Sequence, residues 1–403
     1  MLHYYRYSII MIKGEMKMRP KVMEEVEALR GVNSVKIKEA HEAGKKVVGM
    51  YCVFSPQEIA LAADAISVTL CGTTQEPIEE AEKKLPRNLC PLIKSSYGFA
   101  ITDKCPYFYF SDVLLAETTC DGKKKMYELM AELKPMHVMN LPQTAEGELA
   151  LTMWENEMVR FKNFLEKELG VEITEEKLRN AIKLMNRERD AMKRLHKLNA
   201  YKPAPLTGMD MMLAQWLKGF NVDKEAGIEL IERLIEEVEE RIKEGKFAFD
   251  EKAPRILLTG CPVGSGSEKV IRILEESGAS VVALENCTGY KGLDIMVDEE
   301  KDPITALAEK YLKTPCSCMT PNNSRMDLIK RLAEEYEVDG VVDLTWQACH
   351  TYNIESYFVR NFVKDELNLP FLQIETDYSD SDLGQIKVRV EAFLETISST
   401  VNA

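Results

Sequence analysis

Short apolar runs alternate with amphipathic stretches in the first third of the chain. Four of these runs have the composition of buried strands: 46–52, 65–71, 112–117 and 137–141. Three stretches between and after them have helical character: 56–63, 91–100 and 123–133. This alternation of strand and helix predicts a parallel sheet with helices on both faces.

The pattern changes to a helical period between Glu146 and Lys246. Leu178, Ile182 and Met185 recur at spacings of four and three, as on one face of a helix. The proline-containing segment 201–208 interrupts this region. The middle of the chain is therefore predicted to be an all-helical insert.

The alternation of strands and helices returns after Pro254. Four runs are predicted strands: 255–260, 280–284, 340–344 and 371–375. Five segments are predicted helices: 267–277, 303–312, 325–336, 355–365 and 381–397. The second half should therefore repeat the architecture of the first.

The fold class predicted by these patterns is α/β, with two doubly wound, Rossmann-like parallel-sheet domains and a helical insert between them. We expect a division into an N-terminal extension and helix (1–30), a first α/β domain (31–145), a helical region (146–250) and a second α/β domain (251–403). Ligands of such folds bind beyond the carboxyl ends of the strands.

Charge and hydropathy exclude several partners. The chain has 403 residues, with 52 Lys and Arg against 66 Asp and Glu, so its net charge is −14. Neither nucleic acid nor a membrane is an expected partner, since the chain is acidic and lacks a run of about 18 apolar residues. Residues 4–13 are too short and too charged for a signal peptide, and we expect an upstream extension with a natural start at Met11, Met16 or Met18. A cytoplasmic location follows from this interpretation.

Ten cysteines are the chemically unusual feature of the chain. Six of them end or closely follow a predicted strand: Cys52, Cys71, Cys120, Cys261, Cys287 and Cys349. Cys90 precedes a predicted helix, while Cys316 and Cys318 lie in a loop between two prolines. The remaining cysteine, Cys105, precedes its strand, at the far edge of the predicted sheet. Nine cysteines thus fall on one rim, although three or four of them could be ordinary packing residues.

Thiolates at such a rim favour a soft metal site. They select iron–sulfur clusters or zinc. Zinc is the weaker interpretation, because the chain has no C-x2-C pair and almost no histidine near these cysteines. Disulfide redox chemistry is weaker still without a C-x-x-C motif. A cluster held by dispersed cysteines across a cleft fits the spacing best.

Three further motifs lie near the predicted rim. The segment 260–267 (GCPVGSGS) resembles a phosphate-cradling loop, but it lacks both the Walker ending and the G-x-G-x-x-G spacing, so a tight turn lining a pocket is the simpler interpretation. The lysines at 123–125 could contact a phosphate or a redox partner, or form a solvated charge run. His350 and Glu375 are candidate catalytic residues, because His350 is next to Cys349 and could move protons at a site, and Glu375 ends a late predicted strand.

At these motifs the chain resembles the 2-hydroxyacyl-CoA dehydratase and benzoyl-CoA reductase superfamily over nearly its whole length. The segments that carry the resemblance are YCVFSPQEIALAADA, NLCPLIKSSYG, AETTCDGKKKMYEL, ENCTGYKG, PCSCMTPNNSR and QACHTYNIES. The chain is most similar to the double-cubane cluster branch of anaerobic reductases, because the short sequence motifs around Cys71, Cys105, Cys261 and Cys318 resemble those of that branch.

The resemblance implies a specific cofactor. Three family ligands of a [4Fe–4S] cluster match Cys90, Cys120 and Cys349. The double-cubane branch carries a sulfide-bridged [8Fe–9S] unit in each subunit of a homodimer. A second cubane needs three more thiolates, for which we choose Cys52, Cys316 and Cys318, with Cys71 and Cys261 as close seconds.

The resemblance also implies a function and a partner. A separate ATP-hydrolysing [4Fe–4S] activator would supply electrons, and this chain would be a low-potential reductase component acting on small unsaturated molecules such as acetylene. An alternative is an (R)-2-hydroxyacyl-CoA dehydratase subunit with one [4Fe–4S] cluster. A non-enzymatic alternative is an iron–sulfur carrier or electron-transfer protein.

Overall fold

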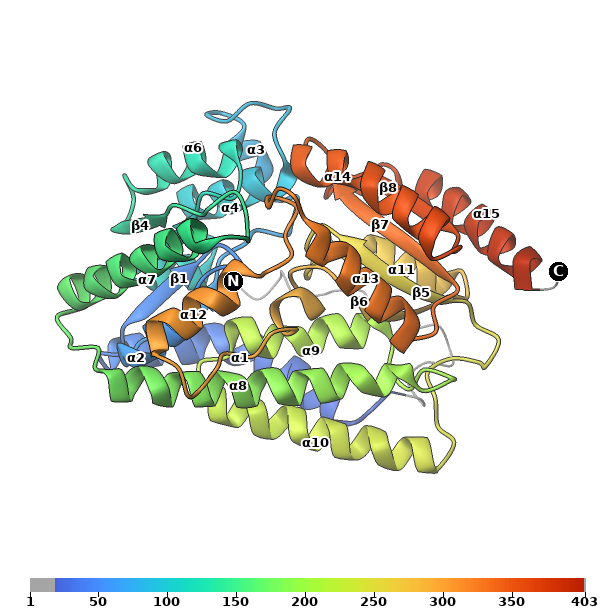
Figure 1. The fold of residues 1–403 in the computed structure, drawn as a ribbon, viewed down its shortest axis with the longest axis horizontal. Coiled ribbons are helices and arrows are strands. Elements are labelled where there is room, and N and C mark those ends of the chain that lie inside the picture. The colour runs from blue at the N-terminus through green and yellow to red at the C-terminus, as the bar shows by residue number, and fades with distance from the viewer. Residues whose placement is uncertain (1–18, 402–403) are drawn as a thin grey trace.

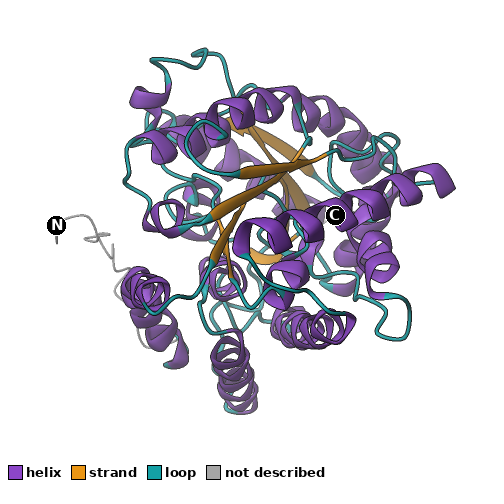
Figure 2. Ribbon diagram, turned by 90° about the vertical axis from the view of Figure 1, so that its left-hand side faces the viewer, coloured by secondary structure: helices purple, strands orange, loops and turns teal. Residues whose placement is uncertain are grey.

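The computed structural model describes residues 19–401, so the expected signals and start positions at 1–18 lie outside the described residues. Two four-stranded parallel sheets form the centre of the molecule, and helices surround them (Figure 1, Figure 2). The first sheet has the order β2-β1-β3-β4, with strands β1 (Val47–Met50), β2 (Ile66–Thr69), β3 (Val113–Glu117) and β4 (Met136–Met139). The second has the order β6-β5-β7-β8, with strands β5 (Arg255–Gly260), β6 (Ser280–Leu284), β7 (Gly340–Trp346) and β8 (Phe371–Thr376).

All eight strands lie where the apolar runs predict them, so the α/β fold class with two Rossmann-like sheets is confirmed. The central strands β1, β3, β5 and β7 are buried along their whole length, as expected of parallel strands covered on both faces. In the register of the first sheet, Val48 pairs with Ser67 on one side and Val113 on the other.

The helices of the first half are α1 (Val22–Glu42), α2 (Gln57–Ala62), α3 (Ile78–Ala81), α4 (Pro91–Ile101), α5 (Pro106–Phe110) and α6 (Asp121–Met130). Those of the second half are α11 (Lys269–Glu276), α12 (Pro303–Leu312), α13 (Asn323–Glu335), α14 (His350–Asn361) and α15 (Leu383–Val401). Short helical turns add Leu198–Ala200, Tyr290–Gly292 and Phe362–Glu366. The expected helix at 355–365 begins earlier, because α14 starts directly after Cys349.

The middle of the chain is helical, as predicted. It consists of α7 (Glu148–Leu169), α8 (Glu175–Lys197), α9 (Gly208–Phe220) and α10 (Lys224–Lys243). Thr174, Thr207 and Asp223 cap the last three of these helices by accepting a backbone N–H bond. Helices α8, α9 and α10 run side by side below both sheets (Figure 1).

Two helices join the halves of the molecule. Helix α9 packs against both β2 and β6, one edge strand of each sheet. Helix α12 follows the second sheet's β6 in sequence, yet it packs against α7 and enters the hydrophobic core of the first sheet. Residues that follow β1, β2, β5 and β6 line one cavity, so the carboxyl ends of both sheets face a shared space. Within residues 19–401, no helix is long and apolar enough to cross a bilayer.

Candidate functional site

Four helices begin directly after a cysteine. Cys90, Cys105, Cys120 and Cys349 occupy the N-cap positions of α4, α5, α6 and α14. The Sγ of Cys105 accepts a hydrogen bond from the Phe108 N–H at 3.4 Å. The unpaired N–H groups of a helix start favour negative charge, so these positions suit thiolates.

One group of thiols joins the two domains. The pKa of Cys349 is well below its ordinary value, because Cys261 and then Cys90 hydrogen-bond to its sulfur. Cys90 comes from the first domain, whereas Cys261 and Cys349 follow β5 and β7 of the second. The Trp346 N–H donates to the Sγ of Cys261 at 3.3 Å. Cys90, Cys261 and Cys349 form what we call the first thiol group.

The backbone around the first thiol group is constrained. Gly260 has φ +105°, and a Cβ there would lie 2.1 Å from the Leu344 carbonyl oxygen, so only glycine fits before Cys261. Ala348 has φ 58°, a left-handed conformation that is costly for a residue with a side chain. Both positions directly precede a thiol of the first thiol group, Cys261 and Cys349, and the strained backbone at Ala348 is of a kind that occurs at functional sites.

A second thiol group consists of Cys287, Cys316 and Cys318. Hydrogen bonds from Cys287 and then Cys318 hold the pKa of Cys316 well below its ordinary value. The Tyr352 hydroxyl lies 4.0 Å from the Sγ of Cys287 and accepts a hydrogen bond from Lys291 at 2.9 Å. Cys287, which received no role from the sequence, is thus placed with the two cysteines of the CSC segment.

Cys52 and Cys120 are electrostatically linked to these groups. Burial raises the pKa of Cys120, and the charges of Cys349 and Cys316 raise it further. Cys120 therefore interacts electrostatically with one member of each thiol group. Burial likewise raises the pKa of Cys52, with Cys316 among its neighbouring charges. The structure therefore brings Cys90 and Cys349 together and Cys316 and Cys318 together, and the choice of the six ligands stays a prediction.

The donor chemistry of these groups fits an iron–sulfur cluster. Across the described residues, no three His, Cys, Asp or Glu side chains are arranged to hold a single metal ion. In a cluster, however, each cysteine binds a different iron, so the ligands stand apart around a larger body. Neighbouring buried thiols without histidine suit that cofactor better than a zinc ion.

A cavity of about 380 Å³ lies beside the thiols. Four cysteines line it: Cys52, Cys71, Cys105 and Cys287. Its walls come from residues after β1, β2, β5 and β6 and from helices α8, α9 and α12. The cavity therefore occupies the position expected of an α/β ligand site, beyond the carboxyl ends of strands from both sheets.

A buried acid stands next to this cavity. Glu117, at the end of β3, is fully buried, and its Oε1 accepts a hydrogen bond from Ser55 Oγ at 2.6 Å. Burial raises the pKa of Glu117 to about 7. Ser55 itself lines the cavity. Glu117 can thus hold or release a proton near neutral pH, a role the sequence did not suggest.

The remaining candidates have simpler surroundings. His350 and Glu375 are exposed and are not among the described residues that line the cavity, and their catalytic role stays a prediction. Lys123 points inward and donates to the Tyr51 carbonyl at 2.9 Å. Lys124 and Lys125 are exposed and paired with Asp121 and Glu128. The lysine run therefore does not act as one surface.

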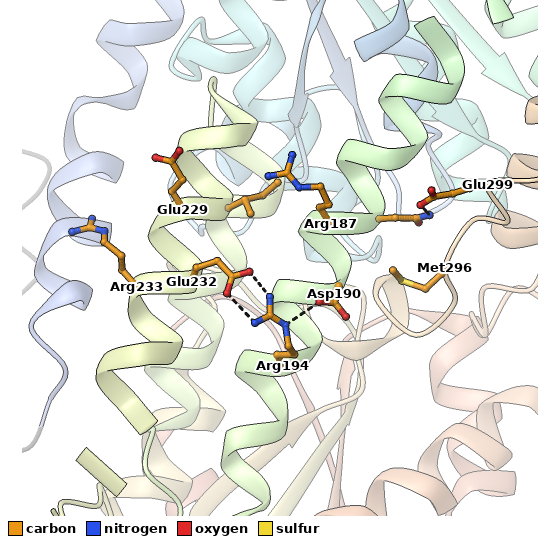
Figure 3. Close-up of a pocket in the computed structure, with 10 residues that line it drawn as sticks. Arg187, Asp190, Arg194, Glu229, Glu232, Arg233, Met296 and Glu299 are labelled. Atoms are coloured by element: carbon orange, nitrogen blue, oxygen red, sulfur yellow. Dashed lines mark hydrogen bonds and ion pairs between the residues drawn. The ribbon is translucent and has the colours of Figure 1, made fainter. Parts of the chain in front are cut away.

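A larger groove of about 670 Å³ lies elsewhere, between α8 and α10 (Figure 3). Arg194 bonds there to Asp190 and Glu232, and no cysteine is among the described residues that line the groove. The other two arginines of the groove are also paired, Arg187 with Glu225 and Arg233 with Glu25, so the thiol-lined cavity is the better candidate site.

The fold and the site define a class: a two-domain α/β protein with a thiol-rich site at the carboxyl ends of both parallel sheets. The chain belongs to the family of the 2-hydroxyglutaryl-CoA dehydratase D-component, whose model matches residues 52–397. The expected superfamily is therefore confirmed, and the chain is an enzyme component of the dehydratase family.

Named relatives support the same family. The chain is 48% identical over 378 residues to the putative dehydratase subunit YjiM of Escherichia coli (strain K12), covering 94% of this chain and 98% of that protein. It is 25% identical to the (R)-phenyllactyl-CoA dehydratase beta subunit of Clostridium sporogenes, over 90% and 94% of the two chains. The corresponding identity to the (R)-2-hydroxyglutaryl-CoA dehydratase beta subunit of Acidaminococcus fermentans is 20%, over 93% and 99%. These relatives favour the dehydratase interpretation over the acetylene-type reductase.

Proposed function

We propose that this chain is the iron–sulfur subunit of a two-component dehydratase, which removes water from a 2-hydroxyacyl-CoA thioester with electrons from an ATP-hydrolysing [4Fe–4S] activator. The observation that carries the proposal is the first thiol group. Its three sulfurs come from both domains and lie at the carboxyl ends of their sheets. Membership of the dehydratase family supports the choice of reaction.

Different residues of the chain would bind the cluster, bind the substrate and exchange a proton. Cys90, Cys349 and either Cys120 or Cys261 would hold the cluster, and the cluster would supply a low-potential electron. The cavity beside the thiols would bind the acyl part of the substrate and exclude water. Glu117 would exchange a proton with the cavity through Ser55, because its carboxyl group is poised near neutral pH.

The test of this function is reconstitution. The protein is purified anaerobically and mixed with activator, ATP and reductant, and then with (R)-phenyllactyl-CoA, lactoyl-CoA or (R)-2-hydroxyglutaryl-CoA. We expect dehydration of at least one thioester, with no turnover when either ATP or activator is omitted. Turnover of none of them by a cluster-loaded protein contradicts the dehydratase proposal.

The second thiol group favours a second candidate function. Six thiols in two groups, with Cys52 and Cys120 linked to them, could hold two joined cubanes, the [8Fe–9S] double cubane of a homodimeric, acetylene-reducing enzyme. The two functions differ in iron content, at about four atoms per chain for a single cubane and about eight for a double cubane. Acetylene reduction by the same mixture, without dehydration of any thioester, would establish the second function.

Serine variants test the ligand set. We expect Cys349→Ser to lose most of its iron, because Cys349 lies between two other thiols at the start of α14. Cys105→Ser is the matched control, since Cys105 also caps a helix and serine is a good N-cap residue. Equal iron contents in both variants would contradict the assignment of the first thiol group.

A further inference from the structure

The cavity beside the thiols is strongly basic, although the chain as a whole is acidic. The described residues that line it include no Asp or Glu. They include six basic side chains: Arg30, Lys104, Lys123, Arg189, Lys218 and Lys310. In a protein with 66 acidic and 52 basic residues, such a lining requires an explanation.

Three of these cations already have negatively charged partners. Two pair with carboxylates that do not line the cavity, and the third faces thiols of the site. Arg189 forms a buried ion pair with Glu58, and Lys104 pairs with Glu76. The charge of Lys123 faces the thiols of Cys52, Cys71 and Cys120, which raise its pKa. These three side chains therefore serve the structure or the thiol site.

Lys218 and Lys310 differ from them. Within the described part of the chain, neither ammonium group forms an ion pair. The carboxylates whose charges act on them, Glu188 on Lys218 and Glu58 on Lys310, are already paired with Lys224 and Arg189. Lys310 is only 5% exposed, and its Nζ lies 3.7 Å from the centre of the Tyr311 ring. Burial lowers the pKa of both lysines, that of Lys218 to about 8; the positive charge of Arg189 lowers both further, and Glu188 and Glu58 offset part of this effect. Burial without an ion-pair partner thus disfavours the charged form of both lysines, and an anion that enters the cavity would restore that form and should bind there.

The neighbouring loop after β5 is not a phosphate cradle. Three of its backbone N–H groups are already used: Val263 donates to Thr288, Gly264 to the Ser267 hydroxyl, and Gly266 to Glu268. Phosphate sites at helix starts depend on free N–H groups of this kind. The lysines are accompanied instead by Trp216, Phe220 and Met212 of α9, which offer apolar surface to a short carbon chain.

We propose that the cavity binds a carboxylate group of the substrate between Lys218 and Lys310, so that the substrate is a short-chain carboxylic acid derivative with a free acid group. This inference deepens the proposed function and rests on it for the identity of the reaction. Apolar walls around a small number of polar groups are typical of small-molecule sites.

Binding of a free acid to the cluster-loaded protein tests the inference without turnover. Isothermal titration under anaerobic conditions compares succinate with its neutral analogue succinamide and with inorganic phosphate. We expect succinate to bind and succinamide not to bind. Lys310→Gln and Lys218→Gln should each raise the Kd for succinate about tenfold or more, because each removes a charge-assisted hydrogen bond. Lys313→Gln, an exposed lysine just after α12, is the control and should leave the Kd unchanged.

Stability and iron content separate a binding role from a structural one. Lys310→Met removes a buried cation that has no counterion, so it should raise the melting temperature while abolishing succinate binding. A fall in melting temperature, or loss of iron together with binding, would assign Lys310 to the fold or the cluster and overturn the inference. Equal binding of succinate and succinamide, or tighter binding of phosphate, would also overturn it. Succinate binding without dehydratase activity would reject only the proposed function.

Discussion

Two buried cations on helices that follow one another in the sequence of the second half have opposite surroundings. Arg325, on α13, is fully buried and contacts three carboxylates: Glu285 at 3.4 Å, Asp343 at 3.6 Å, and Glu355. Lys310, on α12, is almost as buried but has no carboxylate at ion-pair distance within the described residues.

The difference separates a structural charge from a functional one. Arg325 also donates to Thr259 at 2.8 Å, so it joins β5, β7 and the two helices α13 and α14 into one polar network. Its charge is satisfied inside the protein, and nothing further is needed. Lys310 faces a cavity, and a charge left unsatisfied there is available to a ligand.

The largest expected effect is the loss of the paired cation. Arg325→Met leaves Glu285, Asp343 and Glu355 without their shared partner, so it should lower the free energy of unfolding by about 3–5 kcal/mol. Arg331→Met, on the same helix but half-exposed and paired with Asp294 alone, is the control. Urea unfolding of the cluster-loaded protein measures both. Equal stability of the two variants would show that the buried carboxylate contacts of Arg325 contribute no more to stability than the exposed pair of Arg331.

A buried acid sharpens the comparison through its pH dependence. The pKa of Glu117 is raised from its ordinary 4.5 to about 7 by burial, so its neutral form is favoured in the folded protein. This stabilisation is fully present below pH 4.5 and is lost as the pH rises to about 7. We expect Glu117→Gln to lack this loss, so that its stability relative to the wild type rises by about 3 kcal/mol between these pH values. Parallel stability curves from pH 4.5 to 8 would show that Glu117 has an ordinary pKa.

The smallest effect is expected on the surface. Lys124 and Lys125 form exposed ion pairs, and such pairs contribute little because water and salt screen them. The double variant Lys124→Ala/Lys125→Ala should keep the melting temperature of the wild type. It should also keep the activator dependence of turnover, because the inward-facing Lys123 is untouched. A lower rate at limiting activator concentration would restore this helix as a docking site.

The fold could be predicted from the sequence because the apolar residues mark both the strands and the helices clearly. The apolar runs of β1, β3, β5 and β7 are buried on both faces, and the helical middle carries continuous apolar stripes. Helix α1 was harder to recognise along its whole length, because its pattern is weak and leaves Val32 and Val35 half exposed. It runs across residue 30, where we expect the first domain to begin.

The site could be predicted only in part. Position after a strand places most cysteines at one rim, but the grouping depends on contacts between distant segments. Helix α12 crosses to the first domain, and nothing in its own sequence indicates that its lysine becomes buried beside a cavity. Glu375 follows the alternation of β8, in which Ile374 and Thr376 are buried and the residue between them faces outward. A place at the end of a strand therefore does not by itself direct the Glu375 side chain toward the cavity.

The most direct test of the account is the metal content of the anaerobically purified protein. Iron, acid-labile sulfide and zinc are measured on the wild type and on Cys349→Ser. The account predicts at least about four iron and four sulfide per chain in the wild type, and a large loss of both in the variant. Zinc in place of iron, or no metal in a folded protein purified without oxygen, would contradict the assignment of the thiols to an iron–sulfur cluster.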